Sequence, residues 1–278
     1  MPDRRRFLNH LAALPLLCGP LPLRATTADE DTALRAVIAG SHRSAANRAR
    51  DTARHPYETL RFFGLRPGHK VIEIAPGAGW FTEILAPYLR EHGEYYAAHY
   101  GYDTPLEYRR NLRRGFDARL ASRPDLYDRV RMGLFTTTDT LGGIAPEGGA
   151  DLVLTFRNVH NWIEAGHLDA SLQAFARALK PGGVLGVEEH RAAPGSSLET
   201  MKRSGYVTEA FLIERARAAG FELAARSEIN ANPTDTRDHP NGVWSLPPTL
   251  RGGEVDQARF LAIGESDRFT HRYIRAGL

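Results

Sequence analysis

The sequence predicts an open α/β fold built on seven strands, with helices covering both faces of the sheet. Short apolar runs alternate with amphipathic stretches of helical period from about residue 70 to the C-terminus, the order that builds a mostly parallel sheet covered on both sides. The run 151–156 is almost continuously apolar, as in strands buried on both faces. Residues 71–80 lead from a strand through glycines into a helix, a connection that brings backbone close to a nucleotide-like ligand.

The individual elements follow from local signals. Residues 30 to 64 look helical, and further helices are expected at 79–91, from Thr104, at 166–180 and at 208–220. Thr104 is suited to an N-cap because a proline follows it in the first turn. The seven predicted strands lie at 70–75, 94–100, 129–135, 151–156, 184–188, 221–229 and 268–274.

Residues 1–28 have the features of a bacterial export signal rather than of a fold element. Three arginines precede a short apolar run, and Thr26-Thr27-Ala28 offers a small-residue cleavage site. The segment Arg4-Arg5-x-Phe7-Leu8 resembles the twin-arginine consensus, whose cargo crosses the membrane already folded. We therefore expect a periplasmic protein, the alternative being a cytoplasmic protein with a disordered basic tail. Residues 29–278 are expected to form one domain, with a helical cap at 29–66 and a long loop at 230–265.

The charge of the chain belongs to this signal. The chain has 36 basic and 33 acidic residues, and residues 1–28 hold four of the former and one of the latter, which leaves 32 of each. This balance gives no reason to expect a nucleic-acid partner. The single cysteine, Cys18, also lies in the signal, so the remainder can form no disulfide. No apolar stretch reaches the roughly 18 residues that span a bilayer, so we expect no stable membrane insertion after signal removal.

The glycine-containing turn distinguishes two classes of nucleotide-binding protein. A dinucleotide fingerprint needs a third glycine, and Thr82 stands in that position. The pattern Glu73-x-Ala75-x-Gly77-x-Gly79 instead resembles motif I of the class I S-adenosylmethionine-dependent methyltransferases, with alanine in the first glycine position. In that family the loop wraps the amino-acid end of the cofactor, and the resemblance implies that Glu73 holds its ammonium group.

The resemblance extends over roughly residues 55 to 275, to a bacterial group of predicted class I methyltransferases. It rests on the order of the elements, on Lys180-Pro181-Gly182-Gly183 before the fifth strand and on a final strand near Phe269. It implies a Rossmann-like sheet with an antiparallel last strand, S-adenosyl-L-methionine as the cofactor and a small-molecule substrate. It leaves the oligomeric state open.

Two further cofactor contacts are implied, and one departs from the family pattern. The family has an acid at the end of strand two for the ribose hydroxyls, and here alignment places His99 there. Imidazole lacks the paired acceptors of a carboxylate, and Asp103 is a possible substitute. Asp139 falls near the adenine position, although an aspartate there is as often a cap or turn residue.

The segment after the fourth strand is the candidate catalytic segment. Polar residues there face the ligand edge of such sheets, and His160-Asn161-Trp162 resembles the H-D-W triplet of small-molecule O-methyltransferases, whose histidine is the general base. Imidazole titrates near neutrality and suits that task; the alternative is a histidine that caps a helix or bonds to backbone. Arg157 and Asn158 are expected to orient the substrate or the cofactor, and Trp162 to contact the substrate.

Two other regions reach the same edge. Residues 188–191 (EEHR) end strand five, and together with His160 they could form a metal site. Their spacing is not diagnostic of metal ligands, and we expect no bound metal. The long loop 230–265 contains His239 and Trp244, which we expect at the substrate if the loop acts as a cap selecting the acceptor. A solvated surface loop is the alternative.

Two functions follow from these observations. The first is S-adenosylmethionine-dependent methyl transfer to a small molecule, on oxygen rather than nitrogen, with His160 as the base. The second is an exported binding protein that keeps the pocket and has lost turnover. The export signal favours the second, because S-adenosylmethionine is made in the cytoplasm. His99 also favours it, because imidazole lacks the paired acceptors of a carboxylate.

Overall fold

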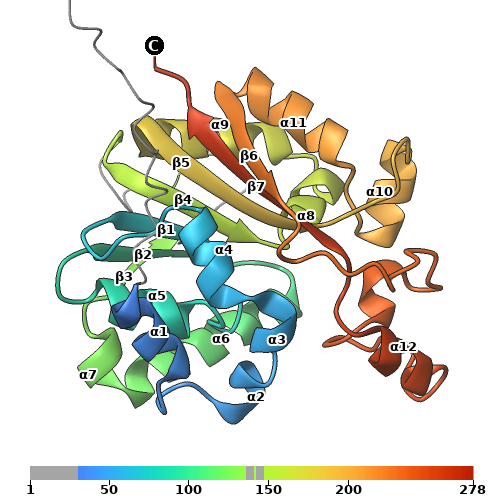
Figure 1. Cartoon of the computed structure of the whole chain (residues 1–278), viewed down its shortest axis with the longest axis horizontal. Coiled ribbons are helices and arrows are strands. Elements are labelled where there is room, and N and C mark those ends of the chain that lie inside the picture. Colours follow the sequence, from blue (N-terminus) through green and yellow to red (C-terminus); the bar gives the residue numbers. More distant parts are fainter. Residues whose placement is uncertain (1–30, 136–140, 142–146, 278) are drawn as a thin grey trace, which may run out of the picture. The chain divides into compact units, whose positions relative to one another are not determined.

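The computed structural model describes residues 31–135, 141 and 147–277, and Thr32–Leu278 form one compact unit. Its centre is a sheet of seven strands in the order β3-β2-β1-β4-β5-β7-β6 (Figure 1). All neighbouring strands pair in parallel except at β7, which is antiparallel to both β5 and β6. The predicted fold class is therefore confirmed. The strands are β1 Lys70–Ile74, β2 Glu94–His99, β3 Arg131–Leu134, β4 Ala150–Phe156, β5 Leu179–His190, β6 Phe221–Ser227 and β7 Arg268–Arg275.

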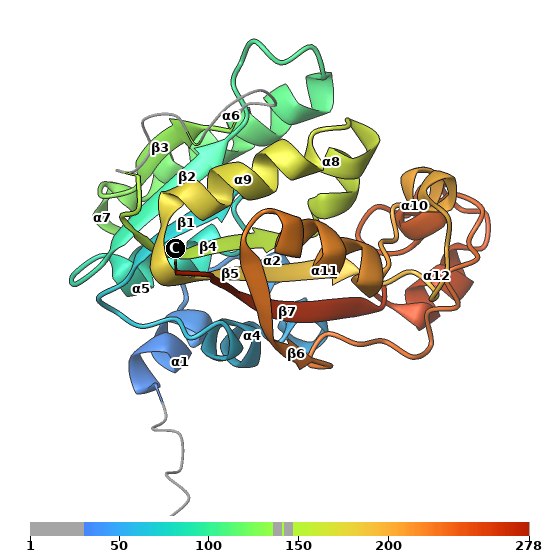
Figure 2. The same ribbon diagram turned by 90° about the horizontal axis from the view of Figure 1, so that it is seen from above.

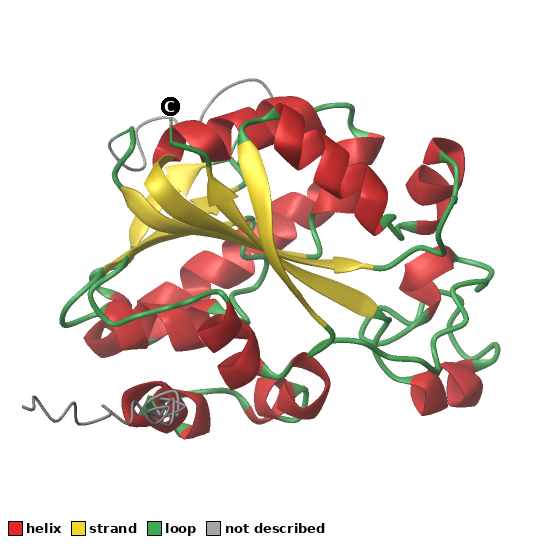
Figure 3. Ribbon diagram, turned by 45° about the horizontal axis from the view of Figure 1, so that its top comes forward, coloured by secondary structure: helices red, strands yellow, loops and turns green. Residues whose placement is uncertain are grey.

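Helices lie on both faces of this sheet (Figures 2 and 3). One face is covered by α1 (Thr32–Ala39), α4 (Pro56–Phe62), α5 (Thr82–Leu89) and α7 (Pro124–Tyr127). The other is covered by α8 (Val159–Glu164), α9 (Leu168–Ala178) and α11 (Glu209–Ala218). The remaining helices are α2 (Ala45–Arg48), α3 (Asp51–Arg54), α6 (Glu107–Ser122), α10 (Leu198–Ser204), the 3₁₀ turn η1 (Gly242–Ser245) and α12 (Gln257–Ile263).

Two hydrophobic cores follow from the alternation of side chains along the strands. Successive residues of a strand point to opposite faces, and in β1 Val71 belongs to the core under α5 whereas Ile72 belongs to the core under α8 and α9. Both side chains are fully buried. Because β1 and β4 are apolar on both faces, they occupy the middle of the sheet, and the residues at their carboxyl ends are held rigidly.

The structure differs from the sequence expectation mainly where helices begin and end. Residues 30 to 64 form four short helices, α1 to α4, rather than extended ones. The helix expected at 79–91 begins only at Thr82, because Gly79 is in the left-handed region with φ +86°. The helix expected at 166–180 ends at Ala178, and the strand expected from 184 starts already at Leu179, next to a register shift in its pairing with β4.

The segment 230–265 is packed beside α10 at one end of the sheet (Figure 1). Its anchor is Asp235, whose side chain is fully buried. The carboxylate accepts a hydrogen bond from the hydroxyl of Tyr206 at 2.9 Å and lies 2.8 Å from Nε2 of His239. It also accepts the backbone N–H of Asp267 at 2.8 Å. These buried bonds hold the first part of the segment in one conformation.

Within the described part of the chain, no helix is both long and apolar enough to cross a membrane. The export signal proposed at 1–28 lies outside the described residues.

Candidate active site

The candidate site lies where β1, β4 and β5 end at the same edge of the sheet. After β1 the chain passes through three residues in the left-handed region, Ala75 (φ +48°), Gly77 (φ +61°) and Gly79 (φ +86°). The alanine holds a conformation that costs a residue with a Cβ about 1–2 kcal/mol. Gly79 is close to α6, because a Cβ there would lie 3.1 Å from Cδ of Arg119. The loop is therefore a tight turn with backbone exposed to whatever lies above β1.

The N-terminal helices hold this loop from the outside. The indole N–H of Trp80 donates to the carbonyl of Asn47 at 3.1 Å. The guanidinium of Arg54 lies 4.8 Å from the centre of the Trp80 ring, a cation–π contact. Helices α2 and α3 are thus fixed against the glycine-containing turn, and Arg54 reaches the site from α3.

Glu73 is buried beneath the loop and is only 2% exposed. The hydroxyls of Tyr95 and Thr82 both donate to its Oε2, at 2.5 and 3.2 Å. Burial raises the pKa of this carboxyl to about 7, and the two hydroxyls and the charge of Arg157 oppose that rise. No donor among the described residues bonds to Oε1. The group therefore changes charge near neutrality, and Oε1 is the atom with capacity for a ligand cation.

His99 ends β2 and is fully buried. Its Nε2 lies 2.9 Å from the carbonyl oxygen of Gly77, and its Nδ1 accepts the backbone N–H of Tyr100 at 2.7 Å. A neutral imidazole has one donor and one acceptor, so both are used, with the proton on Nε2. Burial lowers the pKa of His99, which favours this neutral form. In this arrangement the ring fixes the loop, and its contact with a ribose stays a prediction.

Asn158 and Arg157 follow β4 and have different partners. The amide of Asn158 donates to the carbonyl of Ile74 at 3.1 Å and to the hydroxyl of Thr155 at 3.2 Å. It thereby joins the ends of β1 and β4. Arg157 has φ +60°, a strained conformation for a side chain of its size that is typical of functional sites. Its Nη1 donates to Glu188 at 2.8 Å.

A pocket of about 750 Å³ opens beyond the ends of β4 and β5. Its walls come from α3, from the segment after β4, from the end of β5, from α10 and from the segment 230–265. Arg157, His160 and Trp244 all line it, as the sequence analysis expected of substrate-binding and catalytic residues. That they contact substrate stays a prediction.

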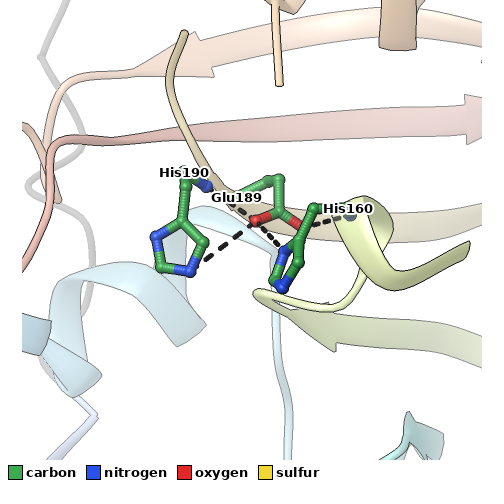
Figure 4. Close-up of side chains that lie close together, drawn as sticks. All are labelled: His160, Glu189 and His190. Carbon is green, nitrogen blue, oxygen red and sulfur yellow. Dashed lines mark hydrogen bonds and ion pairs between the residues drawn. The ribbon is translucent and has the colours of Figure 1, made fainter. Parts of the chain in front are cut away.

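His160 is held by Glu189, a partner that the sequence analysis did not assign to it. Nδ1 of His160 lies 3.0 Å from Oε1 of Glu189, and the backbone N–H of His160 donates to Oε2 at 3.3 Å. Figure 4 shows Glu189 between the two histidines His160 and His190. With the proton on Nδ1 facing the carboxylate, Nε2 is left as an acceptor to which no described residue donates. The ring of Trp244 meets the imidazole edge-on, with ring centres 5.9 Å apart. This is the arrangement of an oriented general base.

The same cluster is a candidate set of metal ligands. His160, Glu189 and His190 each bring a ligand atom within 4.8 Å of the others, and the hydroxyl of Ser266 lies 2.6 Å from Nδ1 of His190. The charges around the cluster disfavour a cation. Burial lowers the pKa of His190 strongly, and three nearby arginines lower it further, namely Arg54, Arg157 and Arg268. The absence of a metal therefore stays our expectation.

Only Arg157, His160 and Trp244 of the predicted site residues line the pocket, and the described cofactor residues lie outside its lining: Glu73, Ala75, Gly77, Gly79, His99 and Asn158. Two predicted substrate residues also lie elsewhere, and one predicted cofactor residue cannot be placed. Trp162 is 2% exposed and packs on Phe175, with ring centres 5.3 Å apart, so it belongs to the core. His239 bonds to Asp235 and packs against Phe260 within the 230–265 segment. The reason in both cases is that the side chain points away from the ligand edge. Asp139 lies outside the described residues.

Arg54 and Glu265 reach the pocket without having been predicted. Nε of Arg54 lies 3.1 Å from a carboxylate oxygen of Glu265, which also bonds to Arg50 and Arg268. These arginines hold the pKa of Glu265 down at about 2, despite its burial. The two residues are 211 positions apart, and no local pattern marks such a pair.

Comparison with known proteins found similar structures but no match to a protein family or to a curated protein sequence. A methyltransferase from Aquifex aeolicus described as dependent on S-adenosylmethionine has a TM-score of 0.54 and 15% identity, covering 82% of this chain and 93% of its own. The corresponding values for a putative sarcosine dimethylglycine methyltransferase from Galdieria sulphuraria are 0.54, 12%, 81% and 84%.

A third similar structure carries a different chemistry. The cyclase SpnF has a TM-score of 0.54 and 18% identity, covering 88% of this chain and 92% of its own. At these identities the likeness establishes the fold alone. The chain therefore has the fold of the class I methyltransferases, with a pocket at the ligand edge of the sheet.

Proposed function

We propose that the protein transfers a methyl group from S-adenosylmethionine to a small-molecule acceptor, on oxygen rather than nitrogen. The observation that carries the proposal is the position of the His160–Glu189 pair. His160 lines the pocket, and Asn158, two residues earlier, bonds to the carbonyl of Ile74, where the loop with left-handed Ala75, Gly77 and Gly79 begins. The similar structure from Aquifex aeolicus supports the cofactor, because that protein is described as dependent on S-adenosylmethionine.

The residues have separate tasks in this proposal. The loop holds the amino-acid end of the cofactor, and Oε1 of Glu73 takes its ammonium group. The bound cofactor supplies a methyl group on a positively charged sulfur. The acceptor hydroxyl lies at Nε2 of His160, which takes its proton as the oxygen attacks, while Glu189 holds the ring and stabilises the imidazolium that forms.

His160→Ala and Glu189→Gln test the assignment of the base. Turnover is followed as S-adenosylhomocysteine released during incubation with S-adenosylmethionine and a metabolite extract, so the acceptor need not be known. We expect His160→Ala to lower the rate at least tenfold with little change in cofactor affinity, because general bases contribute about 10²–10⁴-fold. Glu189→Gln is expected to lower it less and to shift the pH–rate profile. The exposed His92 provides a matched control, His92→Ala. An unchanged rate in His160→Ala excludes this residue as the base.

A binding protein without turnover is the second candidate, and His99 favours it. This position has an imidazole and therefore offers no carboxylate to the ribose hydroxyls. Both of its ring nitrogens are already engaged within the protein. The cyclase SpnF shows that a similar fold serves another chemistry. Binding of S-adenosylhomocysteine together with no detectable methyl transfer to any extract supports this candidate over the first.

A further inference from the structure

The pocket beyond β4 and β5 has a surplus of positive charge. Its lining includes five cationic side chains and two acidic ones, Glu164 and Glu265, among the residues described. The cationic residues come from four separate parts of the chain, which are α3, the end of β4, helix α10 and the segment 230–265: Arg54, Arg157, Lys202, Arg203 and Arg251. A pocket of one charge sign concentrates ligands of the opposite sign.

The pocket residues Arg54, Arg157 and Glu265 belong to a cluster that has more guanidinium groups than carboxylates. Four arginines share two glutamates there. Glu265 bonds to Arg50, Arg54 and Arg268, and Glu188 bonds to Arg157 and lies 3.0 Å from Arg268. The third carboxylate nearby, Glu189, is occupied by His160 and by the backbone N–H of His190. Buried charges need partners, and here four guanidinium groups face three carboxylates, one of which is already bonded to His160.

Arg54 and Arg157 have donors left for a ligand. Arg54 uses Nε toward Glu265, and no bond of its two Nη atoms to any described residue is found. Its side chain is only 5% exposed. Arg157 uses Nη1 toward Glu188 and has no other side-chain hydrogen bond in the described part of the chain. Both residues line the pocket, and the left-handed backbone of Arg157 (φ +60°) shows that this placement is kept despite strain.

The cofactor of the proposed function does not balance this charge. S-adenosylmethionine carries one carboxylate, one ammonium and one sulfonium group, so its net charge is positive. Its sulfonium would add to the positive potential on the acceptor side. The negative charge that balances the pocket must therefore come from the acceptor.

We propose that the acceptor is an organic anion, with an oxyanion group held by Arg54 and Arg157 and its hydroxyl at His160. The inference rests on the proposed function and specifies its substrate class. A planar guanidinium matches a carboxylate with two parallel hydrogen bonds and also binds phosphate. The ring of Trp244 beside His160 provides an aromatic wall for the body of the molecule.

A matched pair of probes tests the charge preference directly. The full-length protein is titrated calorimetrically with 4-hydroxybenzoate and with the neutral 4-hydroxybenzamide, in the absence of cofactor, and inorganic phosphate is titrated separately. We expect the acid to bind at least tenfold more tightly than the amide, and this preference to shrink as the salt concentration rises. Phosphate binding alone assigns the oxyanion to a phosphate-bearing acceptor. Binding of neither anion overturns the proposal.

Variants separate this site from a site for the cofactor carboxylate. Arg157→Gln is expected to abolish the preference for the acid, whereas Arg54→Lys, which keeps the charge, retains part of it. Arg215→Gln, outside the pocket and paired with Asp169, is the control. Each variant is also titrated with S-adenosylhomocysteine and with methylthioadenosine, which lacks the amino-acid group.

Three outcomes of these titrations are decisive. Loss of acid binding with unchanged affinity for S-adenosylhomocysteine supports the proposal. Weaker binding of S-adenosylhomocysteine, with methylthioadenosine unaffected and no preference for the acid, assigns the arginines to the cofactor and overturns it. Acid binding in a protein that does not bind S-adenosylhomocysteine supports the anion site but contradicts the proposed function, so the two failures are distinguishable.

Discussion

The two glycines of the turn after β1 differ in the atoms that an added Cβ would contact. Gly77 and Gly79 both have positive φ, but a Cβ at Gly77 has no heavy atom within 4 Å, whereas one at Gly79 lies 3.1 Å from Arg119 and 3.3 Å from Phe116. Ala75 shows that the turn tolerates one strained alanine. Gly77 is therefore required for its backbone conformation alone, whereas Gly79 is required both for its conformation and because a side chain there would contact α6.

We expect Gly79→Ala to destabilise the protein more than Gly77→Ala. Both variants incur the left-handed strain of about 1–2 kcal/mol, and only Gly79→Ala must also shift side chains of α6, those of Arg119 and Phe116. Thermal unfolding of both variants, followed by circular dichroism, measures the difference. Equal losses of stability would show that α6 is not packed on the turn.

Glu73 makes the stability of the fold depend on pH. Its pKa rises from 4.5 to about 7 on folding, so the folded state favours the neutral acid. The associated stability is fully present below pH 4.5 and is lost as the pH rises through 7. Because one pKa unit corresponds to about 1.4 kcal/mol, the loss amounts to roughly 3 kcal/mol at most.

Glu73→Gln is expected to remove this dependence. The variant should unfold at higher denaturant concentration than the wild type at pH 8 and at a similar concentration at pH 5. Glu222→Gln, at an exposed position of β6, controls for a change in net charge. A wild-type stability that does not fall between pH 5 and 8 relative to Glu73→Gln would contradict the raised pKa.

The cluster of His160, Glu189 and His190 is the candidate metal site, and its surroundings decide whether we expect a metal there. Three arginines act on His190, and their charge opposes a divalent cation at His160, Glu189 and His190. We expect purified protein to contain less than stoichiometric metal by mass spectrometry and methyl transfer to persist after dialysis against a chelator. Loss of activity that zinc restores would show that the cluster is a metal site.

At the scale of elements, the segment 230–265 depends on one buried carboxylate. Asp235 accepts bonds from Tyr206, His239 and the backbone of Asp267. Burial raises the pKa of the Tyr206 hydroxyl, and the charge of Asp235 raises it further. Charge-assisted bonds to buried groups contribute about 1.5–3 kcal/mol each, so this side chain holds the segment against α10 and β7.

Asp235→Asn is expected to loosen the segment locally. Hydrogen exchange followed by mass spectrometry should be faster across 230–267, while β1 and β4 exchange as in the wild type. The exposed neighbour Asp238 gives the control Asp238→Asn. Exchange that accelerates equally in the central strands would mean that the segment unfolds only with the whole protein.

The elements were predictable to the extent that their signal was local. The central strands β1 and β4 are mostly apolar runs, and the glycines at 77 and 79 mark the turn in the sequence itself. The sequence brought residues 188–191 to the same edge as His160, but it did not single out Glu189 as the partner of this histidine, because the contact depends on how β4 and β5 pair. Trp162 was expected at the substrate because it adjoins His160, but on a helix the next two residues point elsewhere, and its ring is in the core.

At the scale of the whole molecule, the first 28 residues set the charge and the proposed location. We expect the chain to reach the periplasm through a twin-arginine route, because Arg4 and Arg5 precede Phe7 and Leu8. The double variant Arg4→Lys, Arg5→Lys should stay in the cytoplasm, as judged by cell fractionation with cytoplasmic and periplasmic marker proteins. An unchanged location would refute this route.

The central claim is that the turn after β1 binds the amino-acid end of S-adenosylmethionine. Calorimetric titration of the protein with S-adenosylhomocysteine at pH 6 and pH 8 tests it most directly. We predict one site per chain and tighter binding at pH 8, because the Glu73 carboxylate, with a pKa of about 7, must be ionised to hold the ammonium group. No heat of binding at millimolar ligand at either pH would contradict the claim.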